Sequence, residues 1–313
     1  MRAPNGRGAW GDDMGYRDRL LKRPWRAFLV LMAMQPLGMA LSALLVYGVF
    51  RLPRQMSDME AFSTATLFTI NALLGYLVAP FVLGLPSGSR TVRAYLADIR
   101  LTTVRPFVPL LALTASCVVI LIACQGTGSI VYRITEGNPV TLDFVRKVFD
   151  LGAALPPRSM LLFAQMFSSL EEVAFRGVLL TMLLRVYSQP KAIACSAAAF
   201  GLLHLPTVFT GVPVMFVLGQ VVWAFLFGLF YGYIFVKSGS LLPSMIIHWL
   251  SNVFQEPLTA YYWTTASIPV RTFYGVVFGY GLAALLSIWW VRFFSARWLP
   301  APAGVESTAA AQG

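Results

Sequence analysis

The sequence has few charged residues: they make up 12% of its 313 residues, whereas hydrophobic residues make up 58%. A typical soluble domain carries about 25% charged residues. The mean hydropathy is +0.69, and the apolar residues occur in runs that no soluble core would need. The low charge and the long apolar runs together exclude a soluble globular protein and predict an integral membrane protein.

The sequence also lacks the alternating ten-residue segments of a transmembrane β-barrel, and it contains no internal repeat. A backbone that faces lipid must then satisfy its hydrogen bonds within helices. Eight segments approach the length of about 20 residues that crosses the hydrocarbon layer, although the fifth and seventh are short. We therefore expect an all-α fold, a polytopic membrane helix bundle of about eight transmembrane helices, at residues 27–50, 62–85, 107–124, 159–184, 192–205, 212–236, 241–254 and 273–294.

The net charge of +11 does not indicate nucleic-acid binding, because the basic residues gather at the ends of the expected helices. This placement follows the positive-inside rule and predicts that both termini are cytoplasmic, in the cell or inner membrane if the source is bacterial. Four basic residues on the opposite loop weaken the assignment: Arg133, Arg146, Lys147 and Arg158. The residues that support it are Arg17, Arg19, Lys22, Arg23, Arg26, Arg90, Arg93, Arg100, Arg105, Arg185, Lys191, Arg292 and Arg297.

The order of segments divides the chain into an N-terminal and a C-terminal half. A stretch at 142–151 is amphipathic and could lie along the membrane surface, although a plain connector fits it equally well. The unusual polar residues all fall after residue 158. The expected parts are a basic cytoplasmic segment at 1–26, three transmembrane helices at 27–125, a loop at 126–158, a core at 159–258, a last transmembrane helix at 259–299 and a disordered tail at 300–313.

The fourth expected helix carries Glu171, Glu172 and Arg176 within an apolar segment. A charge at bilayer depth costs at least about 2.5 kcal/mol, so three of them need a reason. Glu172 and Arg176 are spaced i, i+4 and share a helix face, where they can pair. Glu171 points about 100° away. These residues form either a structural ion pair with one additional acid or part of an active site.

Both histidines of the chain also lie in expected helices: His204 follows Phe200 in the fifth, and His248 precedes Asn252 in the seventh. Either histidine alone would indicate an interhelical hydrogen bond. Together with a carboxylate, the set supplies a general base, proton-transfer partners and hydrogen-bond donors. That combination suits the attack of water on a carbonyl. No Ser or Cys stands beside a base, so a covalent nucleophile is disfavoured.

Three motifs now stand in order: Glu171-Glu172-x-x-x-Arg176, Phe200-x-x-x-His204 and His248-x-x-x-Asn252. This set resembles the CPBP family, which comprises the type II CAAX prenyl endopeptidases and the bacteriocin-processing or immunity proteins formerly called Abi. The resemblance covers about 159–254, and the three motifs together are highly specific.

The resemblance implies an intramembrane endopeptidase in which Glu171 activates water together with His204. His248 and Asn252 would stabilise the oxyanion. Glu172 with Arg176 would hold these groups in place, with Phe200 as further support, and Glu172 could also take part directly. Zinc is an alternative, because family members are often labelled metalloproteases; its ligands would be Glu171, His204 and His248. We slightly favour a mechanism without an obligatory metal.

The expected partners are a membrane-associated or lipidated protein or peptide substrate and the membrane lipid, with no nucleic acid. Two other functions remain open at this stage. One is a non-enzymatic immunity or scaffold protein on the same fold. The other is a proton-coupled transporter, since buried acids and histidines also serve that role; the inverted repeats common in transporters are not seen.

Overall fold

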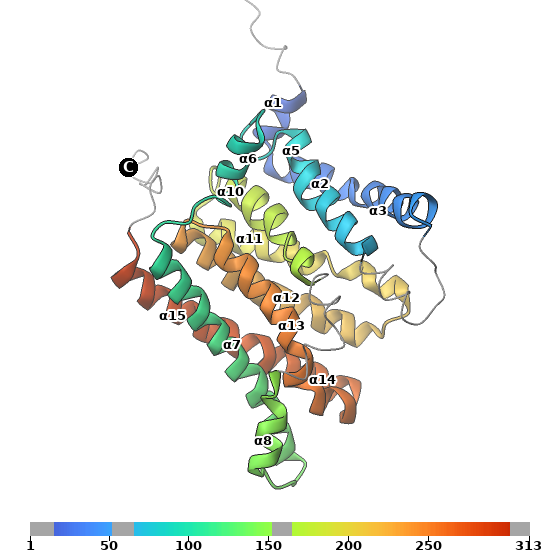
Figure 1. Cartoon of the computed structure of the whole chain (residues 1–313), viewed down its shortest axis with the longest axis vertical. Coiled ribbons are helices and arrows are strands. Elements are labelled where there is room, and N and C mark those ends of the chain that lie inside the picture. The colour runs from blue at the N-terminus through green and yellow to red at the C-terminus, as the bar shows by residue number, and fades with distance from the viewer. Residues whose placement is uncertain (1–15, 52–65, 152–164, 301–313) are drawn as a thin grey trace, which may run out of the picture.

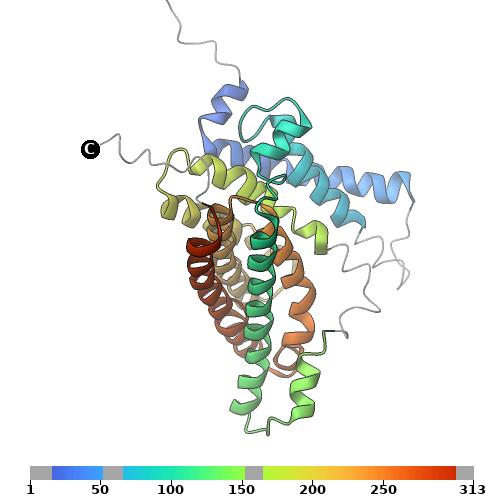
Figure 2. The ribbon, with the colours of Figure 1, turned by 60° about the vertical axis from the view of Figure 1, so that its left-hand side comes forward.

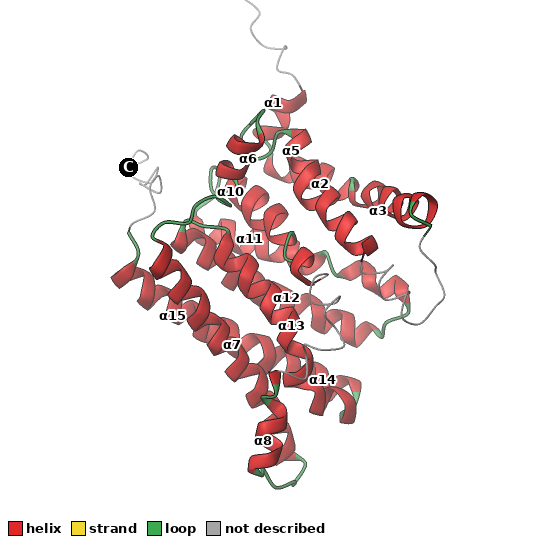
Figure 3. Ribbon diagram, viewed as in Figure 1, coloured by secondary structure: helices red, strands yellow, loops and turns green. Residues whose placement is uncertain are grey.

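The computed structural model describes residues 16–51, 66–151 and 165–300, and all regular structure in these ranges is helical (Figures 1 and 3). The predicted disordered tail and most of the basic N-terminal segment lie outside the described residues. The helices are α1 (Tyr16–Leu21), α2 (Pro24–Ala33), α3 (Gln35–Ala43), η1 (Leu44–Val49), η2 (Leu73–Val78), α5 (Ala79–Leu83), α6 (Val92–Asp98), α7 (Phe107–Thr135), α8 (Leu142–Val148), η4 (Val173–Leu180), α10 (Thr181–Leu183), α11 (Gln189–Leu202), η5 (Leu205–Thr210), α12 (Val214–Ser238), α13 (Leu242–Thr265), α14 (Ile268–Tyr274), η6 (Gly275–Leu282) and α15 (Ala283–Trp298).

Six stretches of continuous helix among the described residues are long and apolar enough to cross a membrane. The predicted class, a polytopic helical membrane protein, is thereby confirmed. The other two of the eight expected helices fall outside this count. The described part of 159–184 is helical but carries the first charged motif, and α13 has 24 residues but is too polar. The six are Pro24–Val49, Thr66–Leu83, Phe107–Thr135, Gln189–Phe209, Val214–Ser238 and Ile268–Trp298.

Helix α7 is longer than the sequence predicts: it does not end at Cys124 but continues to Thr135. Glycines at 126 and 128 suggest a break, because glycine disfavours a helix interior. Both are buried, however, and the Cβ of a residue at Gly128 would lie 3.1 Å from Phe278 Cβ. Close packing against η6 therefore outweighs the local preference, and the expected loop 126–158 begins as helix.

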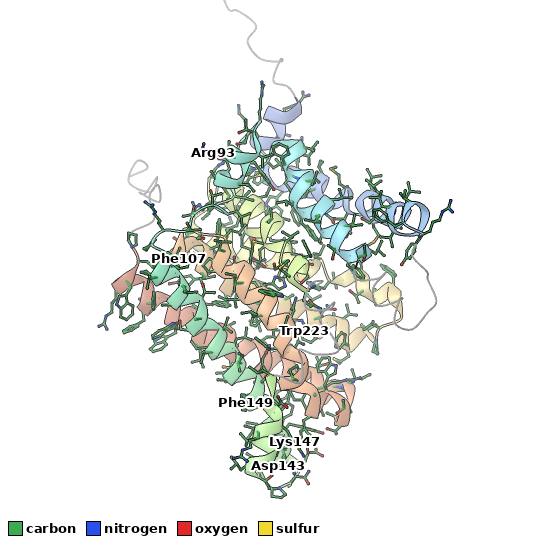
Figure 4. The ribbon with its side chains drawn as sticks, in the orientation of Figure 1. Arg93, Phe107, Asp143, Lys147, Phe149 and Trp223 are labelled. Carbon is green, nitrogen blue, oxygen red and sulfur yellow. The ribbon has the colours of Figure 1, made fainter. Side chains whose placement is uncertain are left out.

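The amphipathic stretch forms α8, at the far end of the molecule from α1 (Figures 1 and 2). Figure 4 places Asp143 and Lys147 at its tip, and the two form an ion pair of 3.0 Å. Phe144 packs against Tyr261 of α13, with ring centroids 4.9 Å apart. Helix α8 is therefore anchored on the bundle through its apolar face.

Helices α11 and α12 pack in close contact, and α11 carries the second motif near its end. A Cβ at Gly228 would lie 2.8 Å from Ala197 Cα, and one at Gly201 would lie 2.7 Å from the Val221 carbonyl oxygen. Gly232 similarly approaches Ile193 at 3.1 Å. The small residues that the sequence places four apart thus bring the helix backbones together, as such residues do in membranes.

Candidate active site

The first motif lies where the fourth expected helix changes its geometry. Residues 165–168 are helical, 169–170 form a turn, and the π-helix η4 begins directly after Glu172. Thr181 Oγ1 donates a hydrogen bond of 3.2 Å to the Arg176 carbonyl oxygen five residues earlier. Short π segments inside helices occur frequently at functional sites. The two adjacent acids directly before this π segment differ in their surroundings: Glu172 is fully buried, whereas Glu171 faces a cavity.

Glu172 is the centre of a buried ionic cluster. Its Oε1 accepts a hydrogen bond of 3.0 Å from Arg176 Nη1 and one of 2.9 Å from His248 Nδ1. The side chains of Glu172 and Arg176 are completely shielded from solvent. The predicted i, i+4 pair is therefore confirmed, and it extends to a histidine on α13. Buried charges persist in proteins when they are paired and hydrogen-bonded in this way.

Aromatic rings enclose this cluster. The Arg176 guanidinium carbon lies 4.5 Å from the centroid of Phe200 and 5.3 Å from that of Tyr231. Tyr231 in turn stacks on His248, at 5.3 Å and 17° between planes. The edge of Phe200 packs near both His204 and His248, at 5.5 and 5.9 Å. Phe200 therefore contacts the Arg176 cation and both imidazole rings.

A cavity of about 330 Å³ brings the predicted residues together. Glu171, His204, His248 and Asn252 all line it, although they come from three separate helical segments. Trp223, which Figure 4 labels near the centre of the molecule, forms part of the wall. Glu172 and Arg176 do not line the cavity, so this arrangement does not favour direct participation of Glu172 in the reaction.

Hydrogen bonds orient His204 and Asn252 in the cavity. His204 lies between α11 and η5, and its Nδ1–H donates to the Phe200 carbonyl oxygen at 3.1 Å, which leaves Nε2 free for another partner. Asn252 Nδ2 donates to Ser168 Oγ at 3.1 Å, and Ser168 Oγ donates to the Gln165 carbonyl oxygen at 2.7 Å. The cavity therefore combines a carboxylate, imidazole rings and an oriented amide donor, as water activation beside a carbonyl requires.

The three candidate zinc ligands do not form a metal site. Glu171, His204 and His248 share the cavity, but within ranges 16–51, 66–151 and 165–300 no three His, Cys, Asp or Glu side chains are grouped so that they could hold a metal ion. The histidine Nδ1 atoms are engaged with Phe200 and Glu172, so only the Nε2 atoms are free for another partner. As these side chains are arranged, they are not grouped to hold a metal, and no step below is routed through one.

The cavity also contains polar residues that the sequence analysis did not single out. Ser168 supports Asn252, while Gln220 and Gln255 add two amides to the wall. The Gln220 Oε1 atom is buried and has no hydrogen-bond partner among the described side chains and backbone. The sequence could have pointed to these residues, because a polar amide within an otherwise apolar span is costly in a membrane and is often functional.

The fold and the site define a polytopic helical membrane protein with a carboxylate–imidazole cavity in its C-terminal half. Residues 154–254 match the model of the family described as Type II CAAX prenyl endopeptidase Rce1-like, which confirms the predicted resemblance. The match covers about a third of the chain and includes all three motifs. No curated protein and no solved structure matches the chain. Residues 154–254 are thus similar to a family whose description is that of an endopeptidase.

We expect Arg176→Leu to destabilise the protein by about 3–5 kcal/mol, the usual cost of removing one partner of a buried ion pair. The change would leave the Glu172 carboxylate with His248 alone. Thermal unfolding in detergent and expression yield measure the effect. Arg297→Leu is the matched control, because Arg297 is exposed at the end of α15. An Arg176→Leu protein that is as stable and active as wild type would contradict the assigned role.

Proposed function

We propose that this protein hydrolyses a peptide bond of a membrane-associated protein or peptide, using a water molecule activated by Glu171. The observation that carries the proposal is the convergence of Glu171, His204, His248 and Asn252 on one cavity. The cavity walls belong mostly to helices that are apolar enough to span the membrane. Such a site can admit a substrate that is itself held in the lipid.

Glu171 is the general base in this proposal. Its carboxylate takes a proton from water as the oxygen attacks the scissile carbonyl carbon, and the same proton later passes to the leaving amine as the C–N bond breaks. His204 accepts a hydrogen bond from that water through Nε2, because Nδ1 is held by the Phe200 carbonyl. The water is thereby oriented as well as activated.

His248 and Asn252 stabilise the oxyanion of the tetrahedral intermediate. The Glu172 carboxylate accepts from His248 Nδ1–H and fixes the orientation of the ring, so that Nε2 is directed to the cavity, where an Nε2–H would donate to the oxyanion. Asn252 supplies a second donor from the next helical turn of α13. Glu172 and Arg176 are positioning residues, because they hold the ring of His248 in place. Such preorganised donors contribute strongly to acyl-group chemistry.

The family description suggests a prenylated substrate, and one wall of the cavity suits an apolar group of that kind. Trp223 stacks on Tyr280 at 5.1 Å, and Phe227 meets Tyr280 edge to face at 4.7 Å. Phe216 packs against Trp223 in the same wall. Aromatic side chains bury large apolar areas. We therefore propose a lipidated protein or peptide as the substrate class, bound with its apolar group against these rings.

Comparison of membrane proteomes tests the proposal and identifies the substrate in the same experiment. Cells that produce the wild-type protein are compared with cells that produce Glu171→Gln at the same level. We expect a small set of uncleaved precursors to accumulate in the variant. Glu136→Gln is the matched control, because Glu136 is exposed at the end of α7. Identical proteomes would refute the enzymatic function, and an unchanged cellular phenotype would then favour the scaffold alternative.

A further inference from the structure

A second pocket, of about 280 Å³, lies at the corner between α1 and α2. Arg19 and Leu20 of α1 line it together with Arg26, Leu29 and Val30 of α2. It shares no lining residue with the candidate active site. Figure 1 shows this corner at the end of the molecule where α6 also lies. Leu21 of α1 packs there against the turn at Gly88, whose added Cβ would lie 3.3 Å from it.

The charged side of this pocket consists of two exposed arginines, Arg19 and Arg26. Neither makes a hydrogen bond, an ion pair or a ring contact within the part of the chain that the structure describes. This differs from Arg176, Arg185 and Arg271, each of which donates to a protein acceptor. Two guanidinium groups on one pocket present planar donor sets that match a phosphate or carboxylate.

The other side of the pocket is apolar and belongs to the membrane. The candidate span begins at Pro24, so Arg19 precedes it, Arg26 lies in its first turn, and Leu29 and Val30 lie within it. Leu29 is 64% exposed, so its side chain offers free apolar surface. A ligand that fills this pocket must therefore carry an anionic group at one end and hydrocarbon at the other. A free anion would use only the arginines.

Neighbouring aromatic residues mark this level as the membrane interface. Trp25 is 37% exposed, and its Nε1–H donates to Tyr187 Oη at 3.4 Å. Lys191 lies over the Tyr187 ring, 4.6 Å from the centroid. Trp and Tyr are enriched at the boundary between membrane and water, where their rings sit at the level of the lipid headgroups. An interfacial position of Trp25 would put the neighbouring Arg26, and Arg19 before it, near the lipid phosphates.

We propose that α1 and α2 form a binding site for an acidic phospholipid, whose phosphate is held by Arg19 and Arg26 and whose acyl chain runs along Leu29 and Val30. The site fixes α1 to the headgroup layer and so defines the depth of the N-terminal helices. In the topology expected from the basic residues, it faces the cytoplasmic leaflet, where acidic lipids are abundant. The site does not depend on peptide-bond hydrolysis, and Glu171→Gln should bind lipid as the wild type does.

Lipid titration of the full-length protein in neutral detergent, followed by native mass spectrometry, tests this site. We expect phosphatidylglycerol to bind more tightly than phosphatidylcholine. Arg19→Gln/Arg26→Gln should raise its dissociation constant by about 30-fold, since each basic residue near the surface contributes about a factor of five. Arg292→Gln/Arg297→Gln removes the same charge from exposed positions on α15 and should leave the constant unchanged.

Two further measurements separate a lipid from a simple anion. Leu29→Gln should weaken phosphatidylglycerol binding while leaving both arginines in place. Inorganic phosphate at equal concentration should not displace the lipid. Displacement by phosphate, equal binding of phosphatidylcholine, or an unchanged affinity of the double arginine variant would each overturn the proposal. All of these variants alter exposed side chains, so a monodisperse, folded protein is expected in every case.

Discussion

The Glu171→Gln protein is expected to turn over its substrate about 10²–10⁴ times more slowly than the wild type, which is the usual contribution of a general base. The substitution keeps the shape of the side chain and its place in the cavity. It removes the group that accepts the proton from water. Because no new charge is buried, folding and substrate binding should persist. The rate is measured under single-turnover conditions on a precursor identified in the proteome comparison.

Glu172→Gln distinguishes the two adjacent acids. Glu172 is buried behind the cavity, where it pairs with Arg176 and His248. Its replacement should lower stability together with activity, whereas Glu171→Gln should lower activity alone. Glu136→Gln, at an exposed position, controls for the loss of one carboxylate. If Glu171→Gln cleaves the precursor at the wild-type rate, Glu171 is not the base and the proposed mechanism is wrong.

Much of the site could be predicted from the sequence, because the spacing of residues along one helix and the cost of charge in a membrane both limit where polar residues can lie. Spacing of i, i+4 fixes a helix face, so Glu172 had to meet Arg176, and they do meet at 3.0 Å. The high cost of charge in a membrane then requires the remaining polar groups to find one another. His248 does so through Glu172. In this protein, a few polar residues in an apolar chain determine the site.

Other features depend on tertiary packing and could not be read from the sequence. The π-helix η4 has no local signature, yet it begins directly after Glu172. The length of α7 depends on Gly128 fitting against Phe278. The amides of Gln220 and Gln255 reach the cavity only because α12 and α13 both pack beside it. Such contacts join residues that are distant in sequence, and no periodicity encodes them.

The buried cluster explains how one cavity can contain two differently used histidines. His248 Nδ1 donates to a carboxylate that is itself paired with Arg176. His204 Nδ1 donates to a backbone carbonyl. One ring is therefore suited to stabilise negative charge, and the other is suited to accept a hydrogen bond. The environment of each ring, rather than its residue type, sets its role.

Asn252→Ala is expected to lower kcat by about 10²–10³-fold, the effect of removing one oxyanion donor. KM should change little, because the donor acts mainly when charge develops on the carbonyl oxygen. The fold should tolerate the change: Asn252 is only half-buried, and its partner Ser168 keeps a hydrogen bond to the Gln165 carbonyl. Steady-state kinetics on the precursor separate kcat from KM.

Two further variants make the test of Asn252 specific. Asn252→Asp keeps the size of the side chain but replaces the donor with an acceptor, so it should be at least as slow as Asn252→Ala. Asn138→Ala changes an exposed asparagine after α7 and should behave as wild type. A loss confined to KM would assign Asn252 to substrate binding. A wild-type kcat in Asn252→Ala would remove Asn252 from the oxyanion site. His248, one turn earlier on α13 in the same cavity wall, would then be the only proposed donor.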